Sequence, residues 1–229
     1  IAEHLNSFRG MIADPNQIIV GAGTEYLYGL LAEILGNDKI YVIESPGYKK
    51  LVQIYMQRGI ECHFAPMDAK GVTVEGLEAS KADVAHICPN HHFPTGITMP
   101  ASRRYEVLNW ANAGDDRYII EDDFESEVTS LRKPEETLFA TSRGEKVIYV
   151  NTFSRTISPA LRVGYMVLPK NLLKLYLNDV GILTGILYKN NIRAVEDREK
   201  EIVAPYTTWT SFSTRAEYER FWMMKKVLI

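Results

Sequence analysis

Short apolar runs alternate with segments of helical spacing along most of the chain. The runs that predict buried strands span residues 17–20, 39–43, 61–65, 83–88, 117–121 and 146–150, and another begins at Val163. Between them, apolar residues recur every three or four positions at 1–10, 24–35, 49–58, 74–80 and 100–113, which predicts helices. Several of the strand runs are apolar at successive positions, as in strands covered on both faces. This order predicts an α/β fold with a mostly parallel sheet and helices on both of its faces.

The pattern is weaker in the last quarter of the chain. Helical spacing is still visible at 171–179, 193–202 and 216–229, but no strand run follows Pro169. We therefore predict a large domain over residues 1–170 and an atypical helical segment over residues 171–229. Within the large domain, the helix at 100–113 is expected to bury a face that consists of Tyr105, Leu108, Trp110 and Ala111.

Composition and charge narrow the class of protein. The 229 residues are 46% hydrophobic and 24% charged, with a net charge of −3, which is ordinary for a globular protein. No block of positive charge suggests a nucleic-acid surface. Two cysteines cannot form a disulfide framework, and neither a signal peptide nor a run of membrane-spanning length is present. These features predict a cytoplasmic protein without a membrane partner.

The turn between the last two strand runs is rich in hydroxyl and guanidinium groups. Hydroxyl donors and arginines together can hold a phosphate without a metal. They are Thr152, Ser154, Arg155, Thr156, Ser158 and Arg162. The alternative is a polar turn that only connects two core strands.

Two other strand ends carry groups that suggest chemistry. Gly21-Ala22-Gly23-Thr24 opens a helix, where free N–H groups and the helix dipole favour an anion, although Thr24 could simply be an N-cap. The segment 121–127 has five acidic residues, which would repel one another unless a cation or a protonated heteroatom lies among them. Its alternative is a solvated acidic loop.

Four residues near another strand end could suggest a metal site, namely His86, Cys88, His91 and His92. Alternation along the strand places His86 and Cys88 on one face, while the paired histidines follow a proline turn. Both the spacing and the number of ligands are wrong for a closed zinc site, so we predict no metal.

Four segments resemble one known family. They read N-T-F-S-R-T-I-S-P-A-L-R-V-G-Y from Asn151, E-S-P-G-Y from Glu44, P-N-H-H-F-P-T-G from Pro89 and E-D-D-F-E-S-E from Glu121. In this order and spacing they resemble the fold-type-I pyridoxal-phosphate (PLP) proteins, especially the aminotransferase-like domains of MocR/GabR-type bacterial transcriptional regulators. The resemblance covers roughly residues 1–170. It implies the large domain of that fold, with an incomplete or atypical C-terminal part.

The resemblance also implies roles for individual residues. Asp122 would pair with the pyridinium nitrogen of PLP, which makes the ring an electron sink. Tyr48 would stack on the ring, and Arg162 would bind the phosphate in a bidentate manner. The other implied phosphate contacts are Ala22, Gly23, Thr24, Thr152 and Ser154.

Three positions depart from the family pattern. Arg155 stands where the family has the lysine that holds PLP as a Schiff base. A guanidinium with a pKa above about 12 is a poor nucleophile and cannot replace that lysine, so Arg155 is expected to be non-functional in catalysis. Phe124 and Phe93 replace a tyrosine and an asparagine that contact the phenolic oxygen of the cofactor.

These departures favour a sensor over a catalyst. We expect an effector- and PLP-binding domain of a transcriptional regulator in which PLP binds without covalent capture. The alternatives are a class I aminotransferase in which Arg155 is an introduced or inactivating substitution, and a degenerate domain kept for dimerisation. The resemblance further implies a homodimer, a small amino-acid or amine effector, and DNA contacts only through a winged-helix domain outside this chain.

Overall fold

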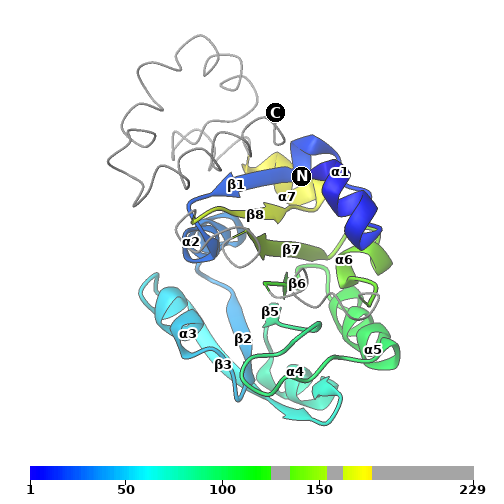
Figure 1. The fold of residues 1–229 in the computed structure, drawn as a ribbon. Coiled ribbons are helices and arrows are strands. Elements are labelled where there is room, and N and C mark those ends of the chain that lie inside the picture. Colours follow the sequence, from blue (N-terminus) through cyan, green and yellow to red (C-terminus); the bar gives the residue numbers. More distant parts are fainter. Residues whose placement is uncertain (125–134, 154–161, 177–229) are drawn as a thin grey trace, which may run out of the picture.

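A mixed β-sheet forms the centre of the computed structural model, which describes residues 1–124, 135–153 and 162–176 (Figure 1). Within these residues the sheet has eight strands in the order β1-β8-β7-β6-β5-β2-β3-β4. Their bounds are β1 Ile18–Gly21, β2 Ile40–Ser45, β3 Glu61–Asp68, β4 Gly71–Val72, β5 Val84–Ile87, β6 Tyr118–Asp122, β7 Val147–Thr152 and β8 Gly164–Val167.

Most of the strand pairs are parallel, as the sequence predicts. β2 pairs with β3 and β5, β5 with β6, and β6 with β7, all in parallel register. β8 runs antiparallel to β7 and β1, and the short β4 forms a hairpin with β3. The order reverses between β2 and β5, because β3 extends the sheet on one side of β2 and β5 on the other. In sheets of this kind, ligands bind beside such a reversal, at the carboxyl ends of the strands.

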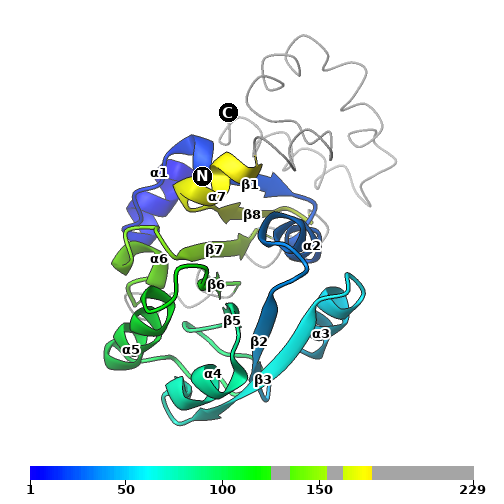
Figure 2. The same ribbon diagram turned by 180° about the vertical axis from the view of Figure 1, so that it is seen from behind.

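Helices cover both faces of the sheet (Figures 1 and 2). One face is covered by α2 (Thr24–Leu35), α3 (Lys49–Met56) and α7 (Lys170–Leu175). The other is covered by η1 (Leu5–Arg9), α4 (Val74–Ser80), α5 (Ala101–Asn112) and α6 (Leu138–Thr141). Two short helical turns, α1 (Ala2–His4) and η2 (Pro15–Gln17), precede the first strand.

Strand residues alternate between the two apolar cores. In β6, Ile120 packs with α2 and α3, whereas Ile119 packs with α5 and α6. Asp122 follows Ile120 by two positions and therefore faces the α2 side. Glu121 and Asp123 face the other side. This alternation separates the three acids at the end of β6.

Two details differ from the sequence-based prediction. Tyr105 of α5 is 59% exposed, so its assignment to the buried face is wrong. The buried stripe contains Arg104 instead, whose guanidinium donates to the carbonyls of Met99 and Pro89. The sequence pattern also missed β4 and α6, because two and four residues are too few to show a periodicity.

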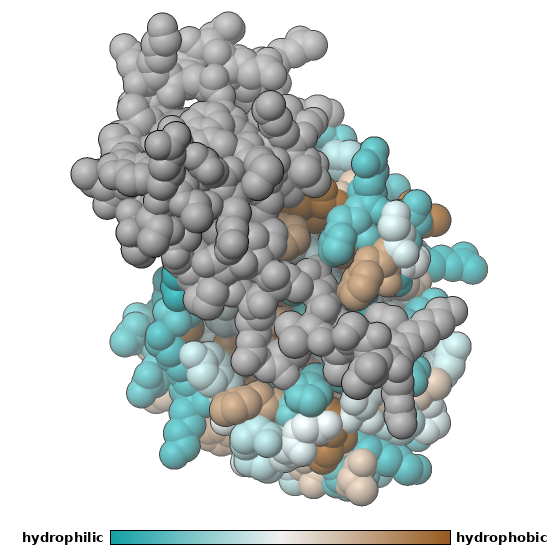
Figure 3. All heavy atoms as spheres, in the orientation of Figure 1, coloured by the Kyte–Doolittle hydropathy of each residue, from teal (hydrophilic) through white to brown (hydrophobic). Residues whose placement is uncertain are grey.

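The surface of the described part is mixed in character. Figure 3 shows hydrophilic and hydrophobic residues interspersed on the part of this face that is not grey. In the described ranges, no helix is both long and apolar enough to cross a membrane. The predicted helices at 193–202 and 216–229 lie outside these ranges.

Candidate cofactor site

A cavity of about 330 Å³ lies at the carboxyl ends of the central strands. Its walls come from β2, the loop after β5, the end of β6, the end of β7, and the starts of α2 and α3. Among the residues that line it are Thr24, Tyr48, Asp122, Phe124 and Thr152. Its size and enclosure suit a small molecule. The structure therefore brings together five of the predicted site residues, at the position where the sheet order reverses.

Asp122 is buried in the wall of this cavity with one carboxylate oxygen unpaired. Its Oδ2 accepts a hydrogen bond of 2.5 Å from the hydroxyl of Tyr28, and His86 Nε2 lies 3.4 Å from the same atom. Its Oδ1 is also buried, but it has no hydrogen-bond partner among the described residues. Leaving a buried charged acceptor unpaired costs about 1–3 kcal/mol or more. A ligand with an N–H donor would satisfy this atom.

The partners of Asp122 are themselves held in place. The hydroxyl of Tyr55 lies 2.7 Å from His86 Nδ1, so the imidazole is fixed from both sides. Burial and the neighbouring Asp122 raise the pKa of Tyr28 well above its ordinary value, so this phenol keeps its proton and donates it. Tyr28 and His86 thereby orient the carboxylate with Oδ1 away from both of them.

The start of α2 has no side-chain cap among the described residues and lies next to the cavity. Gly23 is the N-cap, with φ +95°, and no side chain caps the helix, so the alternative role of Thr24 as an N-cap is wrong. Thr24 is instead the first helical residue and lines the cavity. The free N–H groups at such a start favour a phosphate or another anion.

Arg162 lies against this helix start. Its guanidinium is within contact distance of Gly23, since a Cβ atom placed on Gly23 would be 3.5 Å from Arg162 Nη2. On β8, a Cβ atom on Gly164 would be 3.1 Å from the carbonyl carbon of Gly23, which is tighter than ordinary contact. The absence of a side chain at Gly164 therefore allows the strand and the helix start to pack closely. A cationic group and a helix start without a side-chain cap lie next to each other here.

The other residues that were predicted to contact the phosphate lie in different places. The hydroxyl of Thr152 donates to the carbonyl of Val163 over 3.0 Å. Ala22 is exposed in the turn before α2 and does not line the cavity. Ser154 and Arg155 lie outside the described residues, so their roles stay predictions.

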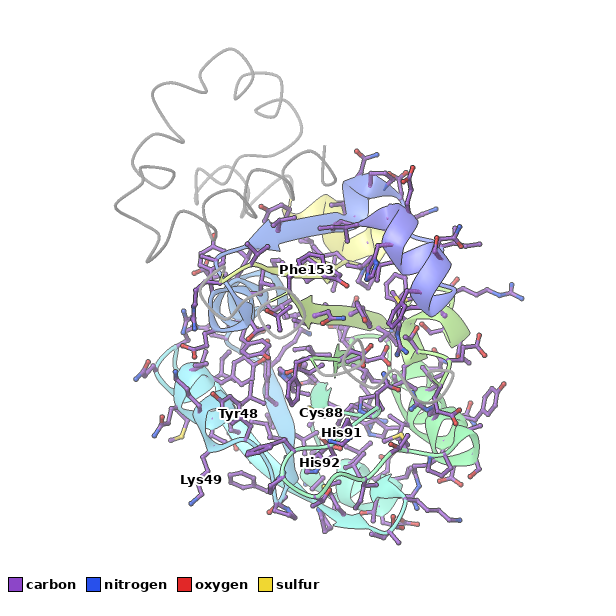
Figure 4. The ribbon with its side chains drawn as sticks, in the orientation of Figure 1. Tyr48, Lys49, Cys88, His91, His92 and Phe153 are labelled. Atoms are coloured by element: carbon purple, nitrogen blue, oxygen red, sulfur yellow. The ribbon has the colours of Figure 1, made fainter. Side chains whose placement is uncertain are left out.

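Aromatic side chains form the open side of the cavity. Tyr48 at the start of α3 is 41% exposed, and its ring meets that of Phe93 edge-on, with 6.4 Å between centroids. Figure 4 shows Tyr48 on one side and Cys88 and His92 on the loop after β5. Phe93 and Phe124 add apolar surface without a hydrogen-bonding group. A flat ring can be covered by such a wall.

The acidic segment after β6 is not a solvated loop where the structure describes it. Glu121 accepts hydrogen bonds from the N–H groups of Leu138 and Phe139. Asp123 pairs with buried Arg9 at 2.9 Å and accepts from the hydroxyl of Tyr149. A cation was expected near these acids, and for Asp123 that cation is Arg9. The sequence pattern did not identify Arg9 as this partner.

No group of three or more potential metal ligands occurs within the described ranges. His86 and Cys88 both line the cavity, as their alternation predicts. His92 is 3.4 Å from Glu44 and hydrogen-bonds the hydroxyl of Thr95.

The family model for aminotransferase class I and II matches residues 1–181. This chain belongs to the aminotransferase class I and II family. The match spans the whole described sheet and every described residue of the cavity. It confirms the fold that the four segments predict.

Curated relatives of this chain are transcriptional regulators. The chain is 33% identical to the HTH-type transcriptional regulator YdeL of Bacillus subtilis, over 76% of this chain and 37% of YdeL. It is 35% identical to the HTH-type pyridoxine biosynthesis transcriptional regulator PdxR of Corynebacterium glutamicum, over 74% of this chain and 37% of PdxR. The chain thus spans well under half the length of these curated relatives.

A solved aminotransferase has the same fold. The kynurenine aminotransferase of Pyrococcus horikoshii aligns with a TM-score of 0.68 and 26% identity, over 78% of this chain and 47% of that enzyme. The resemblance to aminotransferase-like regulators is therefore confirmed for sequence and fold.

The cavity of this aminotransferase family member fits PLP at three places. The unpaired Oδ1 of Asp122 suits a protonated pyridine nitrogen, and the uncapped start of α2 beside Arg162 suits a phosphate. The wall with Tyr48 suits the ring. These are the described residues that could hold the cofactor.

The sequence analysis missed two polar groups in this cavity, Tyr28 and Glu44. Tyr28 follows Thr24 by one helical turn, so helical spacing alone places both on the same face. Glu44 directly follows the apolar run 39–43 and precedes a turn, a position where a charged residue is usually exposed. It is nevertheless only 3% exposed.

Proposed function

We propose that this chain is the ligand-sensing, PLP-binding domain of a transcriptional regulator, and that it binds PLP without a covalent bond. The regulator assignment is supported by relatives such as YdeL and PdxR, which are HTH-type transcriptional regulators. The cofactor assignment is supported by the described residues of the cavity and by Arg162 beside the start of α2. The non-covalent mode is supported by the residue at position 155.

The unpaired Oδ1 of Asp122 supports the proposal most directly. Tyr28 and His86 occupy only Oδ2, and the free atom belongs to a cavity of suitable size. A protonated ring nitrogen would complete this carboxylate, because a charge-assisted hydrogen bond offsets its desolvation. A purely structural acid would be expected to have both oxygens satisfied.

Each part of the site has a separate task in this proposal. Asp122 holds the proton on the ring nitrogen, while the start of α2 and Arg162 bind the phosphate. Tyr48 and Phe93 cover the ring and limit access of water. When bound, PLP supplies an aldehyde that can react with amino groups and a ring that withdraws electrons.

Arg155 determines how PLP is held. Its guanidinium keeps its proton at any physiological pH and is a poor nucleophile towards an aldehyde. The cofactor would therefore stay free to dissociate, and its aldehyde would stay available to an amine or amino-acid effector. Such a domain reports ligand occupancy and does not turn over substrate.

The proposal extends to the whole protein. A homodimer would present two such sites, and DNA would be bound by a winged-helix segment encoded upstream of this chain. A parent gene without any such segment would contradict the regulator assignment while leaving the PLP site unaffected.

A second candidate is a class I aminotransferase inactivated at Arg155. The likeness to the P. horikoshii kynurenine aminotransferase and the retained Asp122 favour it. Phe93 and Phe124 oppose it, because neither can hydrogen-bond the cofactor. The Arg155→Lys variant separates the two, since an aminotransferase would regain turnover with an amino-acid donor.

The proposed site can be tested by calorimetric titration of the protein with PLP. Asp122→Asn should weaken binding by roughly 10- to 100-fold, the equivalent of losing about 1.5–3 kcal/mol from a hydrogen bond to a charged group. Asp115→Asn, at an exposed position, is the matched control and should bind like the unmodified chain. Equal affinities of all three proteins would remove Asp122 from the site.

A further inference from the structure

Glu44 at the end of β2 is a second buried acid in the cavity. It is 3% exposed, and it lines the cavity together with Asp122. Its Oε2 accepts a hydrogen bond of 2.8 Å from the backbone N–H of Cys88. Its Oε1 is buried and has no hydrogen-bond partner among the described residues. One oxygen of Glu44 is thus bound to the protein, and the other is not.

The described walls of the cavity offer Glu44 no permanently cationic group. None of the described residues that line the cavity is a lysine or an arginine. The other titratable groups that line the cavity are Tyr28 from α2, Tyr48 from the start of α3, His86 from β5, Cys88 and His92 from the loop after β5, and Asp122 from β6. Of these, His92 Nε2 lies 3.4 Å from Glu44 Oε2. Burial lowers the pKa of His92, so this neighbour is a neutral imidazole.

These surroundings favour the protonated acid. Burial, reinforced by the negative charge of Asp122, raises the pKa of Glu44 to about 8, despite the opposing hydrogen bond from Cys88. Because Oε2 already accepts the N–H of Cys88, the proton belongs on Oε1. A neutral carboxyl group then has an O–H donor without an acceptor in the described structure.

We propose that Glu44 acts as a neutral hydrogen-bond donor to an acceptor oxygen of the bound ligand, and so helps to determine which ligands the cavity accepts. This inference rests on the proposed PLP-binding function and makes it more specific. Other polar groups of the wall are already engaged, since Tyr28 donates to Asp122 and Thr152 to a backbone carbonyl. Phe93 and Phe124 have no donor to offer.

The two acids of the cavity would thus have opposite roles. Asp122 presents an acceptor, and Glu44 presents a donor. The preferred ligand has a protonated nitrogen at one point and an acceptor oxygen at another. That oxygen is either the phenolic oxygen of PLP or the carboxylate of an amino acid joined to it, and the test below distinguishes the two.

The test measures the dissociation constants of two probes between pH 6.5 and 9. The probes are PLP and phosphopyridoxyl-alanine, a reduced adduct that adds a carboxylate. The proteins are the unmodified chain, Glu44→Gln, Glu44→Met and the exposed control Glu33→Gln. Taking the ratio of unmodified chain to Glu44→Gln at each pH cancels the ionisation of the probe itself.

Glu44→Gln keeps a donor at every pH, so its affinity should be within a few-fold of the unmodified chain at pH 6.5. Above pH 8, the affinity of the unmodified chain should fall relative to Glu44→Gln by about tenfold per pH unit, because an ionised Glu44 cannot donate. Glu44→Met should bind roughly tenfold more weakly at pH 6.5. Glu33→Gln should follow the unmodified chain throughout.

The outcomes separate the alternatives. If the affinity of the unmodified chain falls above pH 8 for both probes, the acceptor of the Glu44 proton is the phenolic oxygen. If it falls for the adduct alone, the acceptor is the carboxylate. Parallel profiles of the unmodified chain and Glu44→Gln for both probes would overturn the inference while PLP binding itself stands. Absence of binding of either probe to the unmodified chain would overturn the proposed function, and this inference with it.

Discussion

Asp122 and Glu44 are chemically similar, yet different groups surround them. Two hydrogen-bonding side chains, Tyr28 and His86, surround one oxygen of Asp122. Glu44 Oε2 accepts the backbone N–H of Cys88 and lies 3.4 Å from His92 Nε2, and burial raises the pKa of this carboxyl group. Residue type alone therefore does not define the chemistry of this cavity. The partners and the burial of each carboxyl group do.

The raised pKa of Glu44 predicts that the ligand-free protein loses stability with rising pH. The folded state keeps this proton up to about pH 8, whereas the unfolded chain releases it near pH 4.5. The stabilising contribution is therefore complete below pH 4.5 and is lost as the pH rises to 8.

Relative to Glu44→Gln, the free energy of unfolding of the unmodified chain should fall by on the order of 3 kcal/mol between pH 5.5 and 8. Chemical denaturation at both pH values measures this difference. If the two proteins keep a constant difference in stability across this range, Glu44 is ionised in the folded state.

At the scale of elements, the start of α2 connects fold and site. Gly23 has φ +95° and ψ 169°, a region that is essentially restricted to glycine. This geometry starts the helix without a side-chain cap, and Arg162 is within contact distance of Gly23. The conformation of one glycine thus shapes the proposed anion site.

Gly23→Ala should destabilise the protein by about 1–3 kcal/mol, because alanine rarely adopts this conformation. It should also weaken PLP binding. Gly36→Ala is the matched control, since Gly36 has a similar φ of +92° at the other end of the same helix. Thermal denaturation and PLP titration of both variants provide the comparison, and equal loss of PLP affinity in both would mean that the helix start is not the phosphate site.

Sequence patterns predicted the elements of this fold well where they were long. α4 has the predicted bounds of Val74–Ser80, and most of the strand pairs are parallel, as predicted. Strand alternation also placed His86 and Cys88 together. Periodicity reports which face is buried, so it is reliable for apolar residues.

The same patterns failed for buried polar residues. In α5, Tyr105 was expected to be buried, but Arg104 is buried instead. Its burial is possible because the carbonyls of Met99 and Pro89 accept hydrogen bonds from its guanidinium. Arg9 is buried because Asp123, more than one hundred residues later in the chain, faces it. Such pairs depend on tertiary contacts that no local pattern encodes.

At the scale of the whole molecule, the sheet separates the cavity on one face from a buried polar network on the other. One face of the β6 end supplies Asp122 to the cavity, and the other holds Glu121 and Asp123 in a buried polar network with the N-terminal helix and α5. The cavity thus adjoins a buried polar network.

The central claim is that this domain binds PLP without forming a covalent bond to it. The most direct test records the visible absorbance of the PLP-saturated protein before and after borohydride reduction, with Arg155→Lys measured alongside. We predict that PLP dialyses away from the reduced unmodified chain, and that the lysine variant retains it as a covalent adduct. A stoichiometric, borohydride-reducible adduct on the unmodified chain would contradict the account.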